Sequence, residues 1–374
     1  MKKLLPVSLP LISSYPYYAG PLAILASRGN HYIPWVLSNF IQLSIDNDYK
    51  LDFFQPWITW KPYECPFLDV QIINRDVFLR QQEQPSGIVE EIINAIDRGY
   101  YVYLKVNHRY LSISSNWYQQ IDNAHELLIY GYCKVSESFQ VADNFGGKYD
   151  FKSCPFDEFI QSCTFSPSFN IDHYNKIILM KPLENVFLGF DLLRVIDSLR
   201  DYIESRITEI RNDLSINWAR NIVVGIRIYQ KIEEYLESLI EQPDKKLDHR
   251  IFHVLWEHKC CMTRRIEYMR GNGLLTDDTI LIQQKELETK ALLFRNRALK
   301  YIVTKDVQII QKIHKEINPF AIQEANLISH MIEHICDINS KTNYEHILGT
   351  DLNYNSCWFL AKSRETWRKV EFPR

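Results

Sequence analysis

The placement of proline divides this chain into two parts that must fold by different rules. Eleven of its fifteen prolines lie at or before residue 167, and the other four stand at positions 182, 243, 319 and 373. Proline removes a backbone donor and disrupts helix interiors, so we expect turns in the first part and long helices in the second. We therefore predict an α+β N-terminal domain over residues 1–183 and an all-helical domain over residues 184–374.

The spacing of apolar residues supports the helical prediction. Leucines and isoleucines recur every three or four positions from Leu192 to Ile210, with charged residues between them, which indicates an amphipathic helix. Similar patterns predict further helices over residues 214–240, 250–270, 278–303, 305–316 and 319–337. We expect turns at residues 242–244 and 271–273, where proline or glycine interrupts the pattern.

The first part mixes helical and strand patterns. We predict helices over residues 21–28, 34–45 and 86–99. Runs rich in β-branched and aromatic residues predict strands over residues 100–106, 126–132, 138–143 and 176–181. Because short turns such as Gly146-Gly147 join neighbouring strands, we expect a mainly antiparallel sheet.

The bulk composition argues against several classes of partner. The formal net charge is -3, so no general basic field favours nucleic acid. No apolar run approaches the length of a membrane span, and Pro6 and Pro10 interrupt the only stretch that resembles a signal peptide. The eight cysteines form no C-x-x-C pair, which favours reduced thiols and a cytoplasmic location. We expect neither nucleic acid nor a membrane as partner.

The stretch HELLIYGYCKVSESFQVADNFGG, residues 125–147, carries the clearest chemistry. His125 stands at the start of one predicted strand and Asp143 at the end of the next. Antiparallel strands joined by a short turn bring these ends together, and a carboxylate fixes the tautomer of an imidazole and raises its basicity. The pair would be the base and the orienting group of a nucleophilic triad. The alternative is a surface histidine beside an ordinary turn aspartate.

A second stretch, YPYYAGPLAILASRG at residues 15–29, is typical of an extended segment that turns into a buried helix. We expect Gly20 and Pro21 in the first helical turn. A thiolate at such a turn gains from the helix dipole, and the backbone N–H groups there can hold an oxyanion. The residue directly before Gly-Pro is Ala19, however, which carries no nucleophile.

Together these stretches follow the chain order of papain-like cysteine enzymes. AGPLAILAS resembles their Cys-Gly-Pro helix start with the cysteine changed to alanine. IINAIDRGYYVYLKVNHRYL, followed by HELLIYGY and FQVADN, resembles more narrowly the N-terminal domain of the BtrH-like family of butirosin biosynthesis. The resemblance covers residues 10–180, and its motifs gain their specificity as a set.

The resemblance implies a papain-like fold and an acyltransferase of peptide or polyketide secondary metabolism. Such proteins move an acyl group from a carrier-protein thioester to an amine through a cysteine acyl-enzyme. By position, Ala19 occupies the nucleophile site, His125 is the base and Asp143 orients it, so this chain would be an inactivated variant. The implied partners are an acyl or peptidyl carrier protein with its phosphopantetheine arm and an amine-bearing acceptor, with no further cofactor.

The resemblance also suggests which residues surround the reaction. Ser13 and Ser14 stand near the position where papain-like relatives often carry an oxyanion glutamine, and the backbone of Gly20 belongs to the same helix start. Asn107 and Tyr110 occupy the V-x-(D/N)-x-x-Y positions and would line the acceptor pocket. The alternative makes Tyr110 a packed aromatic residue and Asn107 a turn former.

Two other functions stay open at this point. A thioester-cleaving cyclase or a cysteine peptidase would share the fold and differ in the acceptor, which would be an internal nucleophile or water. A non-catalytic pseudoenzyme would bind a carrier protein or peptide without turnover. An engineered alanine at position 19 would favour the enzyme, and a natural one would favour the binding protein.

The helical part offers weaker candidates. A spacing of four residues, which can place metal ligands on one helix face, separates His253, Glu257 and Cys261. We favour the alternative, a helix with one packed and one solvated face, and predict no metal site. Two groups of basic residues would suit docking of an acidic carrier protein or would form solvated faces: Arg264, Arg265 and Arg270, and Arg295, Arg297, Lys300 and Lys305.

Overall fold

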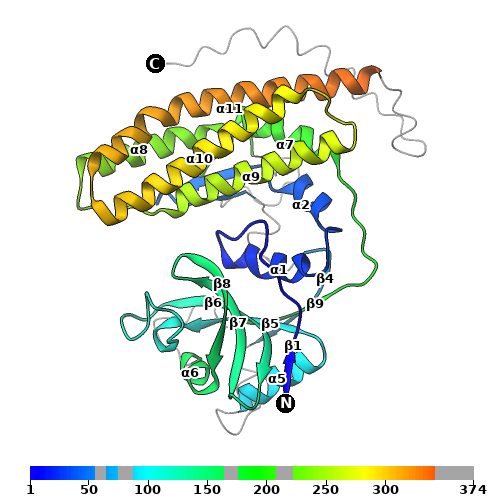
Figure 1. The fold of residues 1–374 in the computed structure, drawn as a ribbon, viewed down its shortest axis with the longest axis vertical. Coiled ribbons are helices and arrows are strands. Elements are labelled where there is room, and N and C mark those ends of the chain that lie inside the picture. Colours follow the sequence, from blue (N-terminus) through cyan, green and yellow to red (C-terminus); the bar gives the residue numbers. More distant parts are fainter. Residues whose placement is uncertain (55–64, 75–86, 164–175, 208–221, 342–374) are drawn as a thin grey trace.

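The computed structural model describes residues 1–54, 65–74, 87–163, 176–207 and 222–341, and it places a sheet region beneath a layer of long helices (Figure 1). The N-terminal region is mixed α/β with an antiparallel sheet, and the C-terminal region is helical, as the sequence predicts. Helix α1 (Pro16–Ala26) lies between these two regions (Figure 1).

Seven antiparallel strands form the main sheet, in the order β4-β9-β5-β6-β7-β8, with β1 paired to β6. Four of them confirm predicted strands: β5 (Tyr101–Asn107), β6 (Ala124–Cys133), β7 (Ser138–Phe145) and β9 (Lys176–Pro182). Three were not predicted: β1 (Lys2–Leu4), β4 (Leu68–Asn74) and β8 (Lys148–Pro155). The predicted glycine turn joins β7 to β8, with φ of 62° at Gly146 and 84° at Gly147, where glycine avoids the strain of a side chain.

The alternation of side chains gives the main sheet two apolar faces. On one face, Tyr103 and Leu128 pack in a cluster that contains α1. On the other face, Leu104 and Leu127 pack in a second cluster with α5 (Gly87–Asp97) and α6 (Phe156–Ser162). Because successive strand residues point to opposite sides, the register decides which residues meet which helix. Helix α5 confirms the helix predicted over 86–99, of which residue 86 lies outside the described residues.

The sequence pattern predicts a helix that begins at residue 21. Helix α1 begins earlier, at Pro16. Proline suits the first helical position because its φ is already helical and its missing N–H would have no partner there. Pro21 consequently lies inside the helix. Most of α1 is buried, which agrees with a helix that is apolar on all sides.

Residues 33–53 form a helix and two strands instead of the single predicted helix over 34–45. Helix α2 (Ile33–Asn39) ends before β2 (Leu43–Asp46), which pairs with β3 (Leu51–Phe53). Tertiary pairing overrides the helical pattern here, since residues 43–46 lie in the middle of a small sheet.

The third strand of the small sheet comes from the part predicted to be all-helical. Strand β10 (Ile222–Val224) pairs with β2, which corrects the all-helical prediction for residues 184–374. The β-branched run Ile222-Val223-Val224 explains the difference, because such side chains favour extended backbone. Residues 214–221 of the predicted helix 214–240 lie outside the described residues.

Long helices make up the rest of the described C-terminal region. Their bounds are α7 (Leu192–Glu204), α8 (Ile228–Glu241), α9 (Arg250–Gly271), α10 (Asp278–Thr304) and α11 (Val307–Lys341). Helix α7 ends earlier than the pattern predicts because Ser205 takes a left-handed φ of 53°. No described helix combines the length and the apolar content needed to cross a membrane.

Helix α11 runs through Pro319, where the sequence predicts a break between two helices. Ile313 and Ile317 before the proline, and Phe320 after it, are all buried in one core. An internal proline costs a helix about 3 kcal/mol. The burial of apolar side chains on both sides of Pro319 outweighs that cost, so the helix continues.

A buried ion pair crosses the helical core. Lys259 on α9 and Glu324 on α11 are 0% and 1% exposed and contact each other directly. Tyr229 on α8 donates its hydroxyl to the other oxygen of Glu324 at 2.5 Å. Burial lowers the pKa of the Lys259 ammonium, against the effect of the Glu324 carboxylate. Loss of either partner would leave a buried charge uncompensated, so the pair constrains how these three helices pack.

The apolar core is continuous across residue 183. Helix α2 packs against α7 and α9, and β3 packs against α9. One apolar cluster extends from the sheet through α1 into the helices. The division into domains 1–183 and 184–374 stays a prediction.

We expect Gly131→Ala to destabilise the protein through β1. A Cβ at Gly131 would lie 2.6 Å from Leu4 Cδ2 and 2.7 Å from the Lys3 carbonyl oxygen, so β1 would have to move. Overpacking of this kind costs about 1–3 kcal/mol in the free energy of unfolding, measurable by urea denaturation. Gly189→Ala is the matched control, since nothing lies within 4 Å of its Cβ position. Equal stability of the two variants would contradict the packing of β1.

Candidate active site

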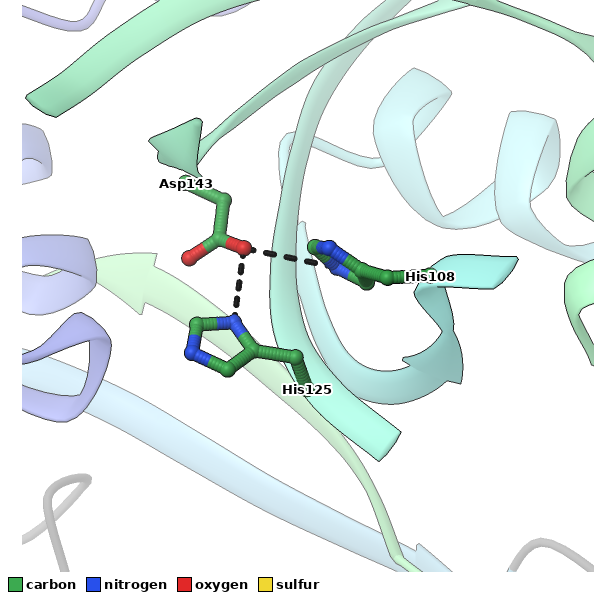
Figure 2. A group of neighbouring side chains, drawn as sticks. All are labelled: His108, His125 and Asp143. Atoms are coloured by element: carbon green, nitrogen blue, oxygen red, sulfur yellow. Dashed lines mark hydrogen bonds and ion pairs between the residues drawn. The ribbon is translucent and has the colours of Figure 1, made fainter. Parts of the chain in front are cut away.

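Three ionisable side chains meet at one end of the central strands (Figure 2). His125 Nδ1 lies 2.8 Å from Asp143 Oδ2, and His108 Nε2 lies 3.4 Å from the same oxygen. Asp143 is 0% exposed and the His108 side chain 3%, whereas His125 keeps 32% of its side chain exposed. The contact between His125 and Asp143 is the one that the sequence predicts. His108 was not predicted as part of the group.

The strand register brings these residues together. His125 pairs with Val106 on β5, and β6 pairs with β7 through Leu128 and Ala142, next to Asp143. His108 begins η1 (His108–Tyr110), directly after the end of β5. His108 stands two positions beyond Val106, so strand alternation continues toward the side on which His125 lies. That spacing is the sequence feature from which His108 could have been found.

Asp143 raises the pKa of both histidines, but the balance against burial differs between them. Burial alone would lower the pKa of His125, but the charge and hydrogen bond of Asp143 outweigh it and raise that pKa to about 9. Burial lowers the pKa of His108 to about 4, because the pull of Asp143 is too weak to offset it there. At neutral pH the group therefore holds one protonated and one neutral imidazole.

The ring of His108 is held in place from two sides. Ser114 Oγ lies 2.8 Å from His108 Nδ1, and the ring of Phe145 packs nearly parallel to it at 6.3 Å between centroids. His108 Nε2 and Asp143 Oδ1 are buried atoms without a hydrogen-bond partner in the described part of the chain. Among the described residues, His108, His125 and Asp143 are also the group whose ligand atoms lie close enough to hold a metal ion.

The Nε2 atom of His125 points away from Asp143 (Figure 2) and makes no hydrogen bond with the described part of the chain. The side chain is partly exposed, so a solute can reach this atom. An imidazole that a buried carboxylate orients through Nδ1 can take or give a proton at Nε2. The arrangement is therefore suited to general acid–base chemistry.

Asn107 ends β5 and caps η1, and Tyr110 is the last residue of η1. Asn107 Oδ1 accepts the backbone N–H groups of Arg109 at 3.2 Å and Asn123 at 3.1 Å, and Nδ2 donates to Asp122 at 2.9 Å. Asn107 is 1% exposed and ties η1 to the start of β6, so it positions His108 and His125. Tyr110 is half-buried at the end of η1.

The structure places Ala19 inside the core. Because α1 begins at Pro16, Ala19 lies in the interior of its first turns, is 0% exposed and donates its backbone N–H to the Tyr15 carbonyl at 2.9 Å. Ala19 belongs to the cluster of Leu128, whereas His125 pairs with Val106 of the opposite cluster. A side chain at position 19 therefore has no exposed surface from which to meet a substrate.

The proposed oxyanion residues are held by the helical region. Glu257 on α9 accepts the backbone N–H groups of Ser13 at 2.7 Å and Ser14 at 3.0 Å, and the Ser13 hydroxyl at 2.8 Å. Asn144, next to Asp143, donates its side-chain amide to the Ser13 carbonyl at 2.9 Å. These donors are engaged within the protein. Gly20 packs on the Tyr103 ring, which a Cβ would approach to 3.2 Å.

The candidate metal-ligand and docking residues of the helical region lie in different environments. His253 Nε2 lies 3.3 Å from Glu257, but Cys261 is 0% exposed in the apolar core, so the three do not form one group. The prediction that Arg265 belongs to a basic surface is wrong. Its side chain is 0% exposed and donates to the carbonyls of Leu37 and Phe40. In the proposed docking surface, Arg270 pairs with Asp278 and Arg297 with Glu316.

Cys133 differs from the buried cysteines of the described chain. Hydrogen bonds, first from the Ser136 side chain and then from backbone groups, lower its pKa to about 7, and its side chain is partly exposed. Burial raises the pKa of Cys65 to about 12. Among the described cysteines, Cys133 is therefore the one that we expect to react most readily with alkylating reagents.

Comparison with known proteins identifies no relative among those searched. No protein-family model matches the chain, and no curated protein matches it either. The papain-like character and the likeness to the BtrH-like family therefore stay predictions from the sequence. Function has to be inferred from the residues described above.

In metal-free protein, we expect the contributions of His125 and His108 to the free energy of unfolding to depend on pH in opposite directions. His125, with its pKa raised from 6.5 to about 9, stabilises fully below pH 6.5 and loses this contribution as the pH rises through 9. Neutral His108, with its pKa lowered to about 4, stabilises fully above pH 6.5 and loses this contribution as the pH falls through 4.

Urea denaturation of the wild type, His125→Gln and His108→Gln between pH 4 and 9 measures both effects. Each stability difference should change by on the order of 2 kcal/mol across its own pH range. His334→Gln, a half-buried α11 residue that contacts Thr276 and lies outside this group, is the control. A flat difference for His125→Gln would show that Asp143 does not couple to that ring, and a flat difference for His108→Gln would show that burial does not lower the pKa of His108.

Proposed function

We propose that this chain catalyses acyl transfer from a carrier-protein thioester to an amine, with His125 as the general base. The observation that carries the proposal is the 2.8 Å contact between His125 Nδ1 and the buried Asp143. The resemblance of residues 10–180 to the BtrH-like family supplies the substrate class. The base is the form of His125 that has lost its Nε2 proton, and its fraction grows as the pH rises toward the pKa of about 9. In that form Asp143 holds the remaining proton on Nδ1, which leaves Nε2 to act on the acceptor.

The reaction follows from that orientation. His125 Nε2 takes a proton from the acceptor amine while the amine nitrogen attacks the thioester carbonyl carbon. The C–N bond forms, the C–S bond breaks, and the imidazolium returns the proton to the leaving thiolate of the phosphopantetheine arm. Asp143 stabilises the imidazolium between these steps.

This route acylates no residue of the protein. It differs from the cysteine acyl-enzyme that the resemblance implies, because Ala19 is fully buried and its N–H group is already bonded. With water or an internal nucleophile as acceptor, the same base would cleave or cyclise the acyl donor. The acceptor therefore decides which of the three reactions takes place.

A binding protein without turnover is the second candidate. The observation that favours it is Ala19, because an apolar residue at the implied nucleophile position removes the covalent step. In that case the chain would hold an acyl-loaded carrier protein, and loss of His125 would leave binding unchanged.

We expect amide formation when the protein is incubated with an acyl-loaded carrier protein and a panel of primary amines. Mass spectrometry of the products should show transfer for the wild type and for His334→Gln. Loss of a general base typically lowers the rate about 100- to 10,000-fold, so His125→Ala should be nearly inactive. Turnover that survives in His125→Ala would overturn the role of His125. Carrier binding without any product would establish the second candidate.

We expect the variant Ala19→Cys to carry an inert thiol. Iodoacetamide should label Cys133 in the native protein, and peptide mapping should find residue 19 unlabelled until the protein is unfolded, because this position is 0% exposed. Cys133→Ser is the control for the reactive thiol. Rapid native labelling at position 19 that disappears with His125→Ala would instead restore the acyl-enzyme route.

A further inference from the structure

We propose that His108, His125 and Asp143 form a binding site for a divalent transition-metal ion of the zinc class. One ligand atom from each residue lies within 4.8 Å of those of the other two. This departs from the sequence analysis, which predicts no metal site. It does not depend on acyl transfer, since binding can be measured without any substrate.

The spacing of the ligand atoms suits an ion. Asp143 Oδ2 lies 2.8 Å from His125 Nδ1 and 3.4 Å from His108 Nε2, and the dashed lines of Figure 2 converge on that oxygen. Ligand atoms about 2.0–2.1 Å from a tetrahedral zinc ion lie about 3.3 Å from each other. Entry of the ion therefore requires a slight widening of the contact between His125 and Asp143, from 2.8 Å.

Two atoms of this group lack partners without an ion. Among the described residues, neither His108 Nε2 nor Asp143 Oδ1, both buried, has a hydrogen-bond partner. Buried polar atoms are nearly always paired, so the unpaired His108 Nε2, which lies 3.4 Å from Asp143 Oδ2, suggests a missing ligand between them. Coordination would give His108 Nε2 a partner.

The hydrogen bond that holds the His108 ring is of the kind found at metal ligands. A ligating histidine ordinarily uses its second ring nitrogen in a hydrogen bond that fixes its orientation. His108 Nδ1 has such a contact with the hydroxyl of Ser114, 2.8 Å away and 2% exposed. When Nδ1 carries the hydrogen, the lone pair of Nε2 faces the carboxylate, an arrangement that a cation between them stabilises.

The ligand set indicates which ions fit. Two imidazole nitrogens and one carboxylate oxygen suit Zn²⁺ and its transition-metal neighbours better than Mg²⁺ or Ca²⁺, which prefer oxygen. The 32% exposure of His125 leaves an approach from solvent and room for water as a further ligand. The three residues come from β6, β7 and η1, which pair or follow paired strands, so the site is held rigidly.

Metal binding and base catalysis exclude each other in this arrangement. An ion on His125 Nδ1 displaces the proton that Asp143 holds there, and the neutral ring then carries its hydrogen on Nε2. His125 cannot accept a proton in that state. If the proposed function holds, Zn²⁺ acts as an inhibitor of the same site.

Titration of the metal-free full-length protein with Co²⁺ and Zn²⁺ tests the proposal. A Cys133→Ser background removes the exposed thiol as a competing ligand. We expect one saturable site, with a Co²⁺ spectrum of nitrogen and oxygen ligation and displacement of Co²⁺ by Zn²⁺. His108→Gln and Asp143→Asn should each abolish this site, and Ser114→Ala should weaken it about 10- to 100-fold.

The control is His334→Gln, which should bind like the background protein. Unfolding in the absence of metal is measured for each variant, so that a folding defect is recognised. Ser114→Ala and Asp143→Asn still decide the matter if His108→Gln fails to fold. A protein without a saturable site, or with a site that survives all three changes, would overturn the proposal. These readouts involve no acyl donor, so acyl transfer can fail independently.

Discussion

The burial of one apolar helix on all sides governs the arrangement of this molecule. Helix α1 lies between the main sheet and the long helices, and it packs on β6, β7 and β9 (Figure 1). Gly20 lies against Tyr103, and Ala19 is fully enclosed. The start of the helix is fastened from both regions, by Glu257 on α9 and Asn144 on β7. A helix packed in this way supports the fold, and it leaves the chemistry to other elements.

That chemistry centres on a single buried carboxylate. Asp143 has no exposure to water, so its charge must be met by the groups around it. His125 meets it as a protonated imidazole, and His108 stays neutral beside it. The same three side chains can thus share either a proton or a metal ion. Under the proposed function, a metal ion on Nδ1 would prevent His125 from acting as a base.

The sequence predicts the elements with strong local patterns and misses those made by tertiary pairing. The helix α5 and the strands around His125 and Asp143 follow from periodicity, and so does the contact of these two residues. Strand β10 and the end of α2 depend on partners distant in the chain, which propensity cannot report. Ala19 shows the same limit, since the position of a helix start relative to the sheet depends on packing.

The pairing of β4 with β9 has a consequence for the layout of the chain. Leu68, at the beginning of the main sheet after α1, lies opposite Pro182 at its end. The chain has by then already passed through α2 and β3, which pack with the later helices. Most of the sheet region therefore leaves the helical scaffold and returns to it at neighbouring points, in the manner of an inserted domain. Changes within residues 69–181 that keep this pairing therefore leave the two points at which the chain joins the helical region side by side.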